Sequence, residues 1–355
     1  MFWASVRGED RDSLASYAKH DLILLGSWRL GLEPNRRPEG LADGSTPASV
    51  LKARETLVEL RGLNPRAVIV SELNFYEYAD DWLPADHPWW LRQEGEKEQF
   101  WPGTHRMDWH NPEYRAHVVR QTKALQDTGI DGVFYDNLRS DEPEPWKAFM
   151  REVRAAVGDD FLILVNAGYD IDGFDWLLPS INGIMYESGW SHDRTDWGEC
   201  IQAMRHNETL LRAPRISAIE RFENLDPHYG WPTNPGWGQR PPRDPAARRW
   251  SMCYTLIVGD YYYLFSDNTS HRHDWYPEYD VKIGFPVGAG ERVNAHVWRR
   301  RYDKALVVVN LPGAKDAYAV KLEAPARDAF TGETGTGFTV APGDGRILVM
   351  EEQGS

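Results

Sequence analysis

The segment "GVFYDN" (residues 132–137) joins a hydrophobic strand to a carboxylate. Its first four residues suit a buried β-strand, yet the run finishes on Asp136 and Asn137. A second segment, "GIMYES" (residues 183–188), has the same order and carries Glu187 at the same place. An acid at the end of a buried strand costs free energy unless it is solvated, paired or used. We therefore expect Asp136 and Glu187 to belong to one site.

The chain on both sides of these segments alternates short apolar runs with amphipathic runs. The apolar runs predict strands at residues 2–6, 22–26, 67–75, 132–135, 161–166, 183–187, 215–220 and 261–266. The runs between them predict helices at about residues 12–19, 46–60, 111–129, 146–157, 174–178, 195–211 and 245–258. Eight strands alternating with helical segments match an α/β fold of the (β/α)8 TIM-barrel type in order and size. An open doubly wound sheet is the alternative, but no glycine-rich phosphate loop follows any of the predicted strands.

The pattern of apolar and polar residues changes near "PVGAGE" (residues 286–291). Beyond it come short strand-like runs with turn residues between them, which are typical of an antiparallel sheet. The sequence therefore predicts two domains, a catalytic barrel over residues 1–288 and a small C-terminal β-sandwich over residues 289–355.

Composition narrows the classes of partner. The formal net charge of -14 argues against nucleic acid, whose phosphates need a clustered basic surface. No run of about 18 apolar residues predicts a membrane span. The two cysteines, Cys200 and Cys253, lack a metal-binding or redox spacing. The first residues do not resemble a signal peptide, so a secreted protein without its leader and a cytoplasmic protein both remain possible, and the oligomeric state is open.

Carboxylates follow strand after strand in this pattern. The active site of such a barrel forms at the C-terminal ends of the strands, where Glu72, Asp136, Asn166, Glu187, Glu220 and Asp267 are expected. Glycoside hydrolysis needs two carboxyl groups on either side of the bond to be cleaved. We predict Asp136 as nucleophile and Glu187 as general acid/base, with Glu220 as the rival for the second role. Glu72, Asn137, Asn166, Glu220 and Asp267 are the expected polar contacts to substrate.

Aromatic residues are abundant, with 16 Trp and 16 Tyr. Many lie in two long segments, residues 75–109 and 221–243, which suit either sugar-binding platforms or lids that pack on themselves. The predicted aromatic contacts to substrate are Trp28, Trp109, Tyr135, Tyr186, Trp190 and Trp231.

Three segments resemble a known family. These are "NPEYRAHVVRQTKALQDTGIDGVFYDN" (residues 111–137), "GIMYES" and "DWYPEYDVKIGFPVGAG" (residues 274–290). They are similar to barrel glycosidases classed as a hypothetical glycoside hydrolase family and, more distantly, to the endo-α-1,4-polygalactosaminidase group. The resemblance implies a carbohydrate substrate, with the acid after the fourth strand as nucleophile and the acid after the sixth as proton donor. These positions are Asp136 and Glu187.

Two further functions stay open at this stage. One is a barrel that binds carbohydrate without cleaving it. The other is a metal-dependent sugar isomerase or lyase, in which the same acids hold a divalent ion with His271 or His273. The spacing of these two histidines, with no third histidine nearby, favours the glycosidase, for which we expect neither metal nor cofactor.

Overall fold

A computed structural model of the chain describes residues 1–3, 13–35, 42–137, 143–166, 171, 173–187, 196–222, 245–266, 271 and 274–350. The chain splits into two compact units. The first contains Met1–Glu187 and Asn207–Ala218, and the second contains Ser188–His206 and Ile219–Ser355. The predicted domain boundary near residue 288 immediately precedes the first strand of an antiparallel sheet, and it stays a prediction.

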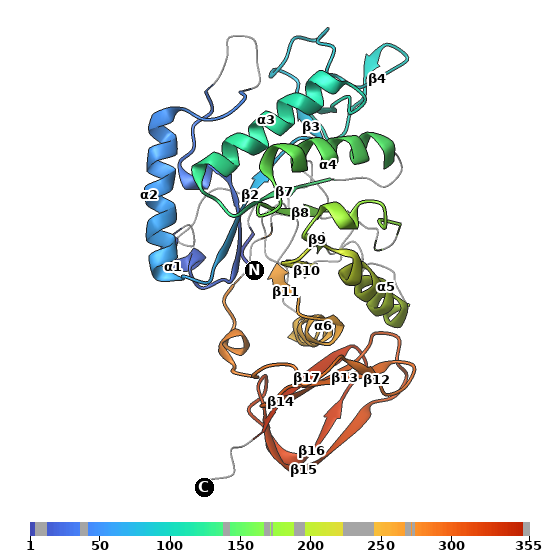
Figure 1. Cartoon of the computed structure of the whole chain (residues 1–355). Helices are drawn as coiled ribbons and strands as arrows, with labels where there is room; N and C mark the ends of the chain where they lie inside the picture. The colour runs from blue at the N-terminus through green and yellow to red at the C-terminus, as the bar shows by residue number, and fades with distance from the viewer. Residues whose placement is uncertain are drawn as a thin grey trace. The chain divides into compact units, whose positions relative to one another are not determined.

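The predicted fold class is confirmed: a parallel barrel sheet is followed by an antiparallel β domain (Figure 1). The order of the barrel strands is β1-β2-β7-β8-β9-β10-β11. They are β1 (Leu22–Gly26), β2 (Val68–Leu73), β7 (Gly132–Tyr135), β8 (Leu162–Asn166), β9 (Gly183–Tyr186), β10 (Ala218–Phe222) and β11 (Tyr262–Ser266). Residues 1–3 lie beside β1, since the Phe2 amide donates to the Leu22 carbonyl at 2.8 Å. Of the strand predicted at residues 2–6, residues 4–6 lie outside the described part.

The helices alternate with these strands, largely at the predicted positions. They are α1 (Leu14–Tyr17), α2 (Pro47–Leu63), α3 (Pro112–Thr128), α4 (Pro143–Val157), α5 (Trp197–Leu210) and α6 (Pro245–Val258). The caps of α2 and α3 explain where they begin, because the side chains of Thr46 and Asn111 accept backbone N–H groups of the first turn. Gly129 ends α3 in the left-handed region, at φ 95°. At residues 174–178, where a helical turn was predicted, the amides of Leu177 and Leu178 donate to the Phe174 carbonyl, and a short 3₁₀ helix, η2 (Leu178–Ser180), follows.

Alternation along β7 decides which side chains face the helices and which face the interior of the barrel. The hydroxyl of Tyr135 lies 2.6 Å from that of Thr122 on α3, whereas the ring of Phe134 packs against Trp3. Successive strand residues point to opposite faces, so Asp136 shares the inner face with Phe134. In the register of the sheet, Glu72 of β2 lies opposite Phe134 and therefore belongs to the same face.

Glycine begins β7 because the neighbouring strand approaches it closely. A Cβ atom at Gly132 would lie 2.5 Å from the carbonyl oxygen of Leu162 on β8. We expect Gly132→Ala to lower the free energy of unfolding by about 2 kcal/mol through this overlap. Gly62→Ala is the matched control, because its Cβ meets nothing within 4 Å and alanine favours the helix. Urea denaturation checks the pair, and equal stability of the two variants would contradict the close approach.

The long segment between β2 and α3 forms two small antiparallel ribbons. One pairs β3 (Glu77–Ala79) with β6 (Thr104–Arg106), and the other pairs β4 (Arg92–Gln93) with β5 (Glu96–Lys97). Several of its aromatic rings are internal: Phe75 packs against Trp109 of the same segment at a ring separation of 4.8 Å and against Trp146 of α4 at 5.5 Å, and Trp90 is buried. Trp82 is 46% exposed. These contacts favour a packing role for the segment over a sugar-binding platform, and the choice between the two stays a prediction.

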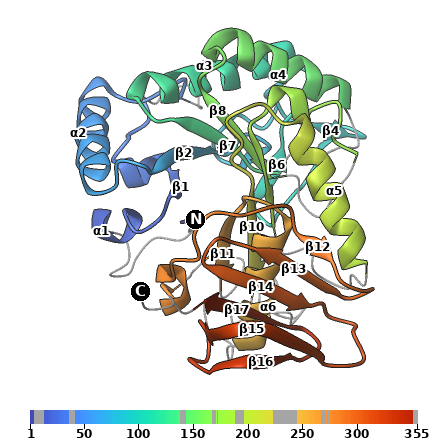
Figure 2. The same cartoon turned by 60° about the horizontal axis from the view of Figure 1, so that its bottom comes forward.

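The second unit ends in a six-stranded antiparallel sheet that covers α6 (Figure 2). Its strands are β12 (Glu291–Arg292), β13 (Val297–Arg301), β14 (Ala305–Asn310), β15 (Tyr318–Asp328), β16 (Thr334–Val340) and β17 (Asp344–Met350). The long strand β15 pairs with β16 along both of its halves, with a register shift between Lys321 and Ala326, and with β17 at its end. One buried core of this sheet includes Val308, Phe338 and Leu348. Arg249 of α6 binds Asp344 with two hydrogen bonds, at 2.7 and 2.9 Å. Among the described residues, no helix has the length and apolar character that a membrane span requires.

Candidate active site

Asp136 lies directly after β7, where the chain turns. Asn137 has φ 58°, in the left-handed region that asparagine tolerates better than most residues. In this conformation its backbone N–H donates to Oδ1 of Asp136 at 3.0 Å, and its side-chain Nδ2 donates to Oδ2 at 3.1 Å. Asn137 therefore fixes the orientation of both carboxylate oxygens.

Asn166 brings Asp136 and Glu187 together. It is the last residue of β8, it is 2% exposed, and β8 lies between β7 and β9 in the sheet. Its Nδ2 donates to Oδ1 of Asp136 at 2.8 Å and to Oε2 of Glu187 at 2.7 Å. One amide nitrogen carries two hydrogens, so it can serve both acids at once.

This shared donor limits the separation of the two acids. Two oxygens bound to one nitrogen at these distances lie at most about 5.5 Å apart. The sheet register explains the arrangement: Tyr135 pairs with Val165, and Asn166 pairs with Met185. Asp136, Asn166 and Glu187 are then inner-face residues at the ends of three successive strands. The sequence prediction that Asp136 and Glu187 lie together is consistent with this geometry.

Glu72 is held by Trp3, which was not among the predicted site residues. The indole Nε1 of Trp3 donates to Oε2 of Glu72 at 3.2 Å. The Trp3 ring is buried and packs edge-on against Phe134, with ring centroids 5.3 Å apart. The sequence places Trp3 in the first predicted strand, but no spacing in the sequence links Trp3 to Glu72 of β2.

Glu77 is a second residue that the sequence reading missed. It lies in β3 and is 7% exposed. Burial raises the pKa of Glu77 to about 7, and the negative charges of Asp136 and, more weakly, Glu72 act in the same direction. A hydrogen bond with Asn74 lowers the pKa and partly opposes them. The acid itself is visible in the run "NFYEY", but no sequence pattern predicts the β3–β6 ribbon in which Glu77 lies opposite Arg106.

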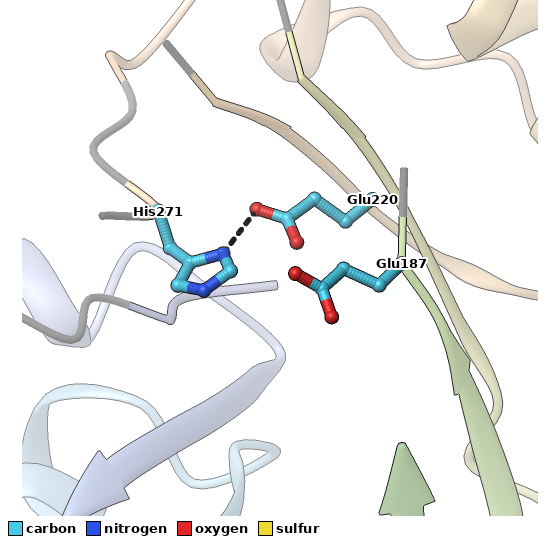
Figure 3. A group of neighbouring side chains, drawn as sticks. All are labelled: Glu187, Glu220 and His271. Atoms are coloured by element: carbon cyan, nitrogen blue, oxygen red, sulfur yellow. Dashed lines mark hydrogen bonds and ion pairs between the residues drawn. The ribbon is translucent and has the colours of Figure 1, made fainter. Parts of the chain in front are cut away.

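Glu220 belongs to the second unit and has its own partners there. Its side chain is fully buried, and its Oε1 accepts a hydrogen bond from the hydroxyl of Ser266 at 2.7 Å. Nδ1 of His271 lies 2.8 Å from the same oxygen, and Figure 3 shows the imidazole turned toward Glu220. This arrangement fits a fixed carboxylate better than an acid that exchanges protons with solvent.

The aromatic residues expected at the substrate separate into three groups. Trp109, Tyr135 and Tyr186 are at most 4% exposed, and the Tyr186 hydroxyl accepts a hydrogen bond from Asn207 at 2.9 Å. Their positions favour a packing role over contact with a substrate. Trp28 is half-buried, with the guanidinium of Arg29 4.3 Å from its ring centre. Trp190, Trp231 and the acid Asp267 lie outside the described residues, as does His273.

Comparison with known proteins gives one family and a set of similar folds. The model of the family described as hypothetical glycosyl hydrolase family 15 matches residues 71–306, well over half of the chain. No curated protein matches.

Solved structures show the same fold at low sequence identity. A GH27 β-L-arabinopyranosidase from Geobacillus stearothermophilus, in complex with arabinose, has a TM-score of 0.59 and 11% identity, over 97% of this chain and 93% of that one. An α-amylase from Geobacillus thermoleovorans, in complex with acarbose, has a TM-score of 0.56 and 12% identity, over 97% and 91%. Both are similar to this chain in architecture.

Proposed function

This chain belongs to hypothetical glycosyl hydrolase family 15, and from that premise we propose that it cleaves an O-glycosidic bond by a retaining mechanism. Its membership and its barrel fold make it a glycoside hydrolase that acts on carbohydrate. The roles of individual residues are part of the proposal. Asp136 is the proposed nucleophile, and Glu187 is the proposed general acid/base.

One observation carries this assignment: Asn166 donates to both acids. The resulting upper limit of about 5.5 Å between the bound oxygens agrees with retaining enzymes, whose carboxyl groups lie about 5–5.5 Å apart. Inverting enzymes separate theirs by about 6.5–9.5 Å to leave room for a water molecule. The short separation of Asp136 and Glu187 therefore supports a retaining mechanism.

The reaction then proceeds in two steps. An oxygen of Asp136 bonds to the anomeric carbon while the glycosidic C–O bond breaks, and the leaving oxygen keeps the electron pair and takes a proton from Glu187. Water next attacks the anomeric carbon and gives a proton to Glu187. The bond between Asp136 and the anomeric carbon breaks in this step, and Asp136 leaves as a carboxylate. The donors from Asn137 and Asn166 hold Asp136 in one orientation for the attack.

The remaining polar residues supply contacts in this proposal. Glu72, fixed by Trp3, is suited to accept hydrogen bonds from sugar hydroxyls. Asn137 and Asn166 act on substrate chiefly through the two acids that they orient. Trp28 is the described aromatic residue that we retain as a sugar contact. The roles of Glu220, Asp267, Trp190 and Trp231 stay predictions.

A panel of polysaccharides and aryl glycosides tests the function directly. We expect at least one member to release product with the unmodified protein, with no effect of a chelator, and not with Asp136→Asn. Binding measured by calorimetry without any product would favour a carbohydrate-binding barrel instead. Loss of activity on adding a chelator would favour the metal-dependent alternative.

A further inference from the structure

Trp82 is the exception in the long segment between β2 and α3. It is 46% exposed, whereas every other tryptophan that the structure describes is buried or partly buried. A single exposed aromatic residue needs no functional explanation by itself. The contacts of this segment, however, hold the indole and a neighbouring carboxylate in fixed positions.

Tyr78 of β3 supports the indole of Trp82. Their ring centroids lie 5.2 Å apart, and the ring planes are tilted by 36°. Tyr78 is buried, and its hydroxyl donates to the carbonyl of Asn74 at 2.9 Å. The amide of Trp82 donates to the carbonyl of Ala79 at 3.1 Å, which closes a turn directly after β3. The exposed part of the indole is therefore presented to solvent already ordered, which reduces the entropy cost of binding a ligand.

The same turn carries a fixed carboxylate, Asp80. Its side chain is 52% exposed, and its Oδ1 pairs with Nζ of Lys97 and lies 2.8 Å from Nδ1 of His105. The side chains of both partners are mostly buried. The hydrogen bond from Lys97 lowers the pKa of Asp80, so the carboxylate stays ionised. Nζ of Lys97 also lies 4.7 Å from the ring centre of the buried Trp90. Asp80 thus offers solvent an acceptor whose direction is set from behind.

An exposed indole in the same turn as a fixed carboxylate suits a neutral sugar unit. The apolar C–H face of a sugar ring packs on an aromatic ring, and sugar hydroxyls donate to a carboxylate. An anionic ligand is disfavoured, because Asp81 adds a second exposed acid and the chain has a net charge of -14. A protein partner needs a wider apolar surface, but the residues that flank Trp82 are the exposed Asp81 and the buried Leu83.

The topology of the barrel places this turn on the catalytic face. The segment leaves β2 after Leu73 and ends where α3 begins at Pro112. In such a barrel the segments that follow strands lie on the face that carries the active site, and the turns that follow helices lie on the opposite face. Asp136, which follows β7, belongs to the same face as this segment. Trp82 and Asp80 are carried there by a ribbon rather than by a strand end.

We propose that Trp82 and Asp80 form a subsite for one neutral sugar unit of a carbohydrate chain, away from the bond that is cleaved. The indole packs against one face of the sugar ring, and the carboxylate accepts hydrogen bonds from its hydroxyls. No bond forms or breaks here, so the subsite contributes binding free energy only. That this sugar belongs to the substrate rests on the proposed function, whereas binding of a sugar by the two residues does not.

Titration with neutral hexasaccharides of glucose, galactose, mannose and xylose tests the binding. The titrated protein carries Asp136→Asn, so that it does not consume the ligand. Trp82→Phe assigns the indole N–H resonance of Trp82, which we expect to shift with at least one hexasaccharide in ¹H–¹⁵N NMR spectra. Trp82→Ala should raise the Kd of that ligand about fivefold or more, and Asp80→Asn about threefold. Hexagalacturonate, an anionic probe, should leave the resonance unshifted.

Two matched controls accompany these variants. Phe285→Ala removes another exposed aromatic ring, which belongs to the second unit and is 81% exposed. Asp159→Asn removes the charge of another paired carboxylate, since the side chain of Asp159 is 80% exposed and lies 2.7 Å from Nη2 of Arg212. Asp159 follows α4, so it lies on the opposite face of the barrel. Both controls should keep the Kd within about twofold.

The binding data overturn the proposal in any of three cases. The first is that no neutral hexasaccharide shifts the Trp82 resonance. The second is that Trp82→Ala and its control Phe285→Ala bind with the same Kd. The third is that hexagalacturonate shifts the resonance more than the neutral probes, which would assign an anionic ligand.

Kinetics on substrates of two lengths give the second readout. On a long substrate from the panel, Trp82→Ala should raise KM about fivefold or more and change kcat much less, because the subsite binds ground state and transition state alike. The loss of kcat/KM on an aryl glycoside of a single sugar should be at least about threefold smaller. Equal losses on both substrates would indicate a damaged ribbon and would reject the proposal.

The outcomes separate this inference from the proposed function. If the panel yields no product, the hexasaccharide titration still decides whether Trp82 and Asp80 bind sugar. If the protein releases product and neither variant changes binding or KM, this inference fails and the proposed function stands.

Discussion

Asp136→Asn is expected to lower kcat by on the order of 10³-fold or more. The substitution removes the proposed nucleophile, and the new amide group faces donors from Asn137 and Asn166 that require an acceptor. The measurement is kcat and kcat/KM on the best substrate of the panel, with unfolding in urea recorded in parallel. Asp159→Asn should keep the activity of the unmodified protein.

A smaller substitution at the same position separates a nucleophile from a merely structural acid. In Asp136→Gly, added azide can occupy the vacated space and attack the anomeric carbon. We expect azide to restore turnover of an activated aryl glycoside and to yield a glycosyl azide of inverted configuration. If Asp136→Asn retains full activity, or azide produces no glycosyl azide, Asp136 is not the nucleophile.

Glu187→Gln is the second variant with a large expected effect. The proposed acid protonates the leaving oxygen, so its loss should reduce kcat/KM by about 10²–10⁴-fold for substrates whose leaving group needs a proton. An activated aryl glycoside leaves without that proton, and the first step on it should be much less affected. The contrast between the two substrates is the diagnostic measurement.

The matched control is Glu59→Gln, an exposed glutamate on α2. It should match the unmodified protein on both substrates. An equal loss on both substrates in Glu187→Gln would point to damage in positioning rather than to lost proton donation. In that case Glu220 or another acid would have to supply the proton.

Much of the barrel was predictable because local signals and the global fold agree in this sequence. The caps Thr46 and Asn111 and the terminator Gly129 mark helix ends that the structure reproduces. The apolar runs before Asp136, Asn166 and Glu187 are long enough to identify three neighbouring strands. Because parallel strands end at one rim, their final residues were expected to meet. The family resemblance is confirmed, and its more distant likeness to polygalactosaminidases stays a prediction.

The parts that were missed depend on tertiary contacts. The strand β16, "TGTGFTV", carries Gly335 and Gly337 and lacks a continuous apolar face, so its pairing with β15 decides its conformation. Trp3 reaches Glu72 across 69 positions of sequence. Glu77 lies opposite Arg106 in the β3–β6 ribbon, across 29 positions of sequence. No local pattern encodes these distances.

The aromatic residues show what composition alone does not predict. Abundance of Trp and Tyr does suit a carbohydrate site, but composition does not separate a platform from a core. Tyr135 and Tyr186 follow from strand alternation: if the acids after them point inward, the tyrosines point outward toward the helices. That rule was available from the sequence and favours packing for both residues.

The most direct test of the central claim is to trap the glycosyl-enzyme. An aryl 2-deoxy-2-fluoro glycoside of the sugar that the panel identifies forms the intermediate but hydrolyses slowly, because fluorine destabilises the cationic transition state. Mass spectrometry of the tryptic digest should then find one fluorosugar on the peptide of residues 124–139, with fragmentation placing it on Asp136. A fluorosugar on Glu187 or Glu220, or release of a product with inverted anomeric configuration, would contradict the account.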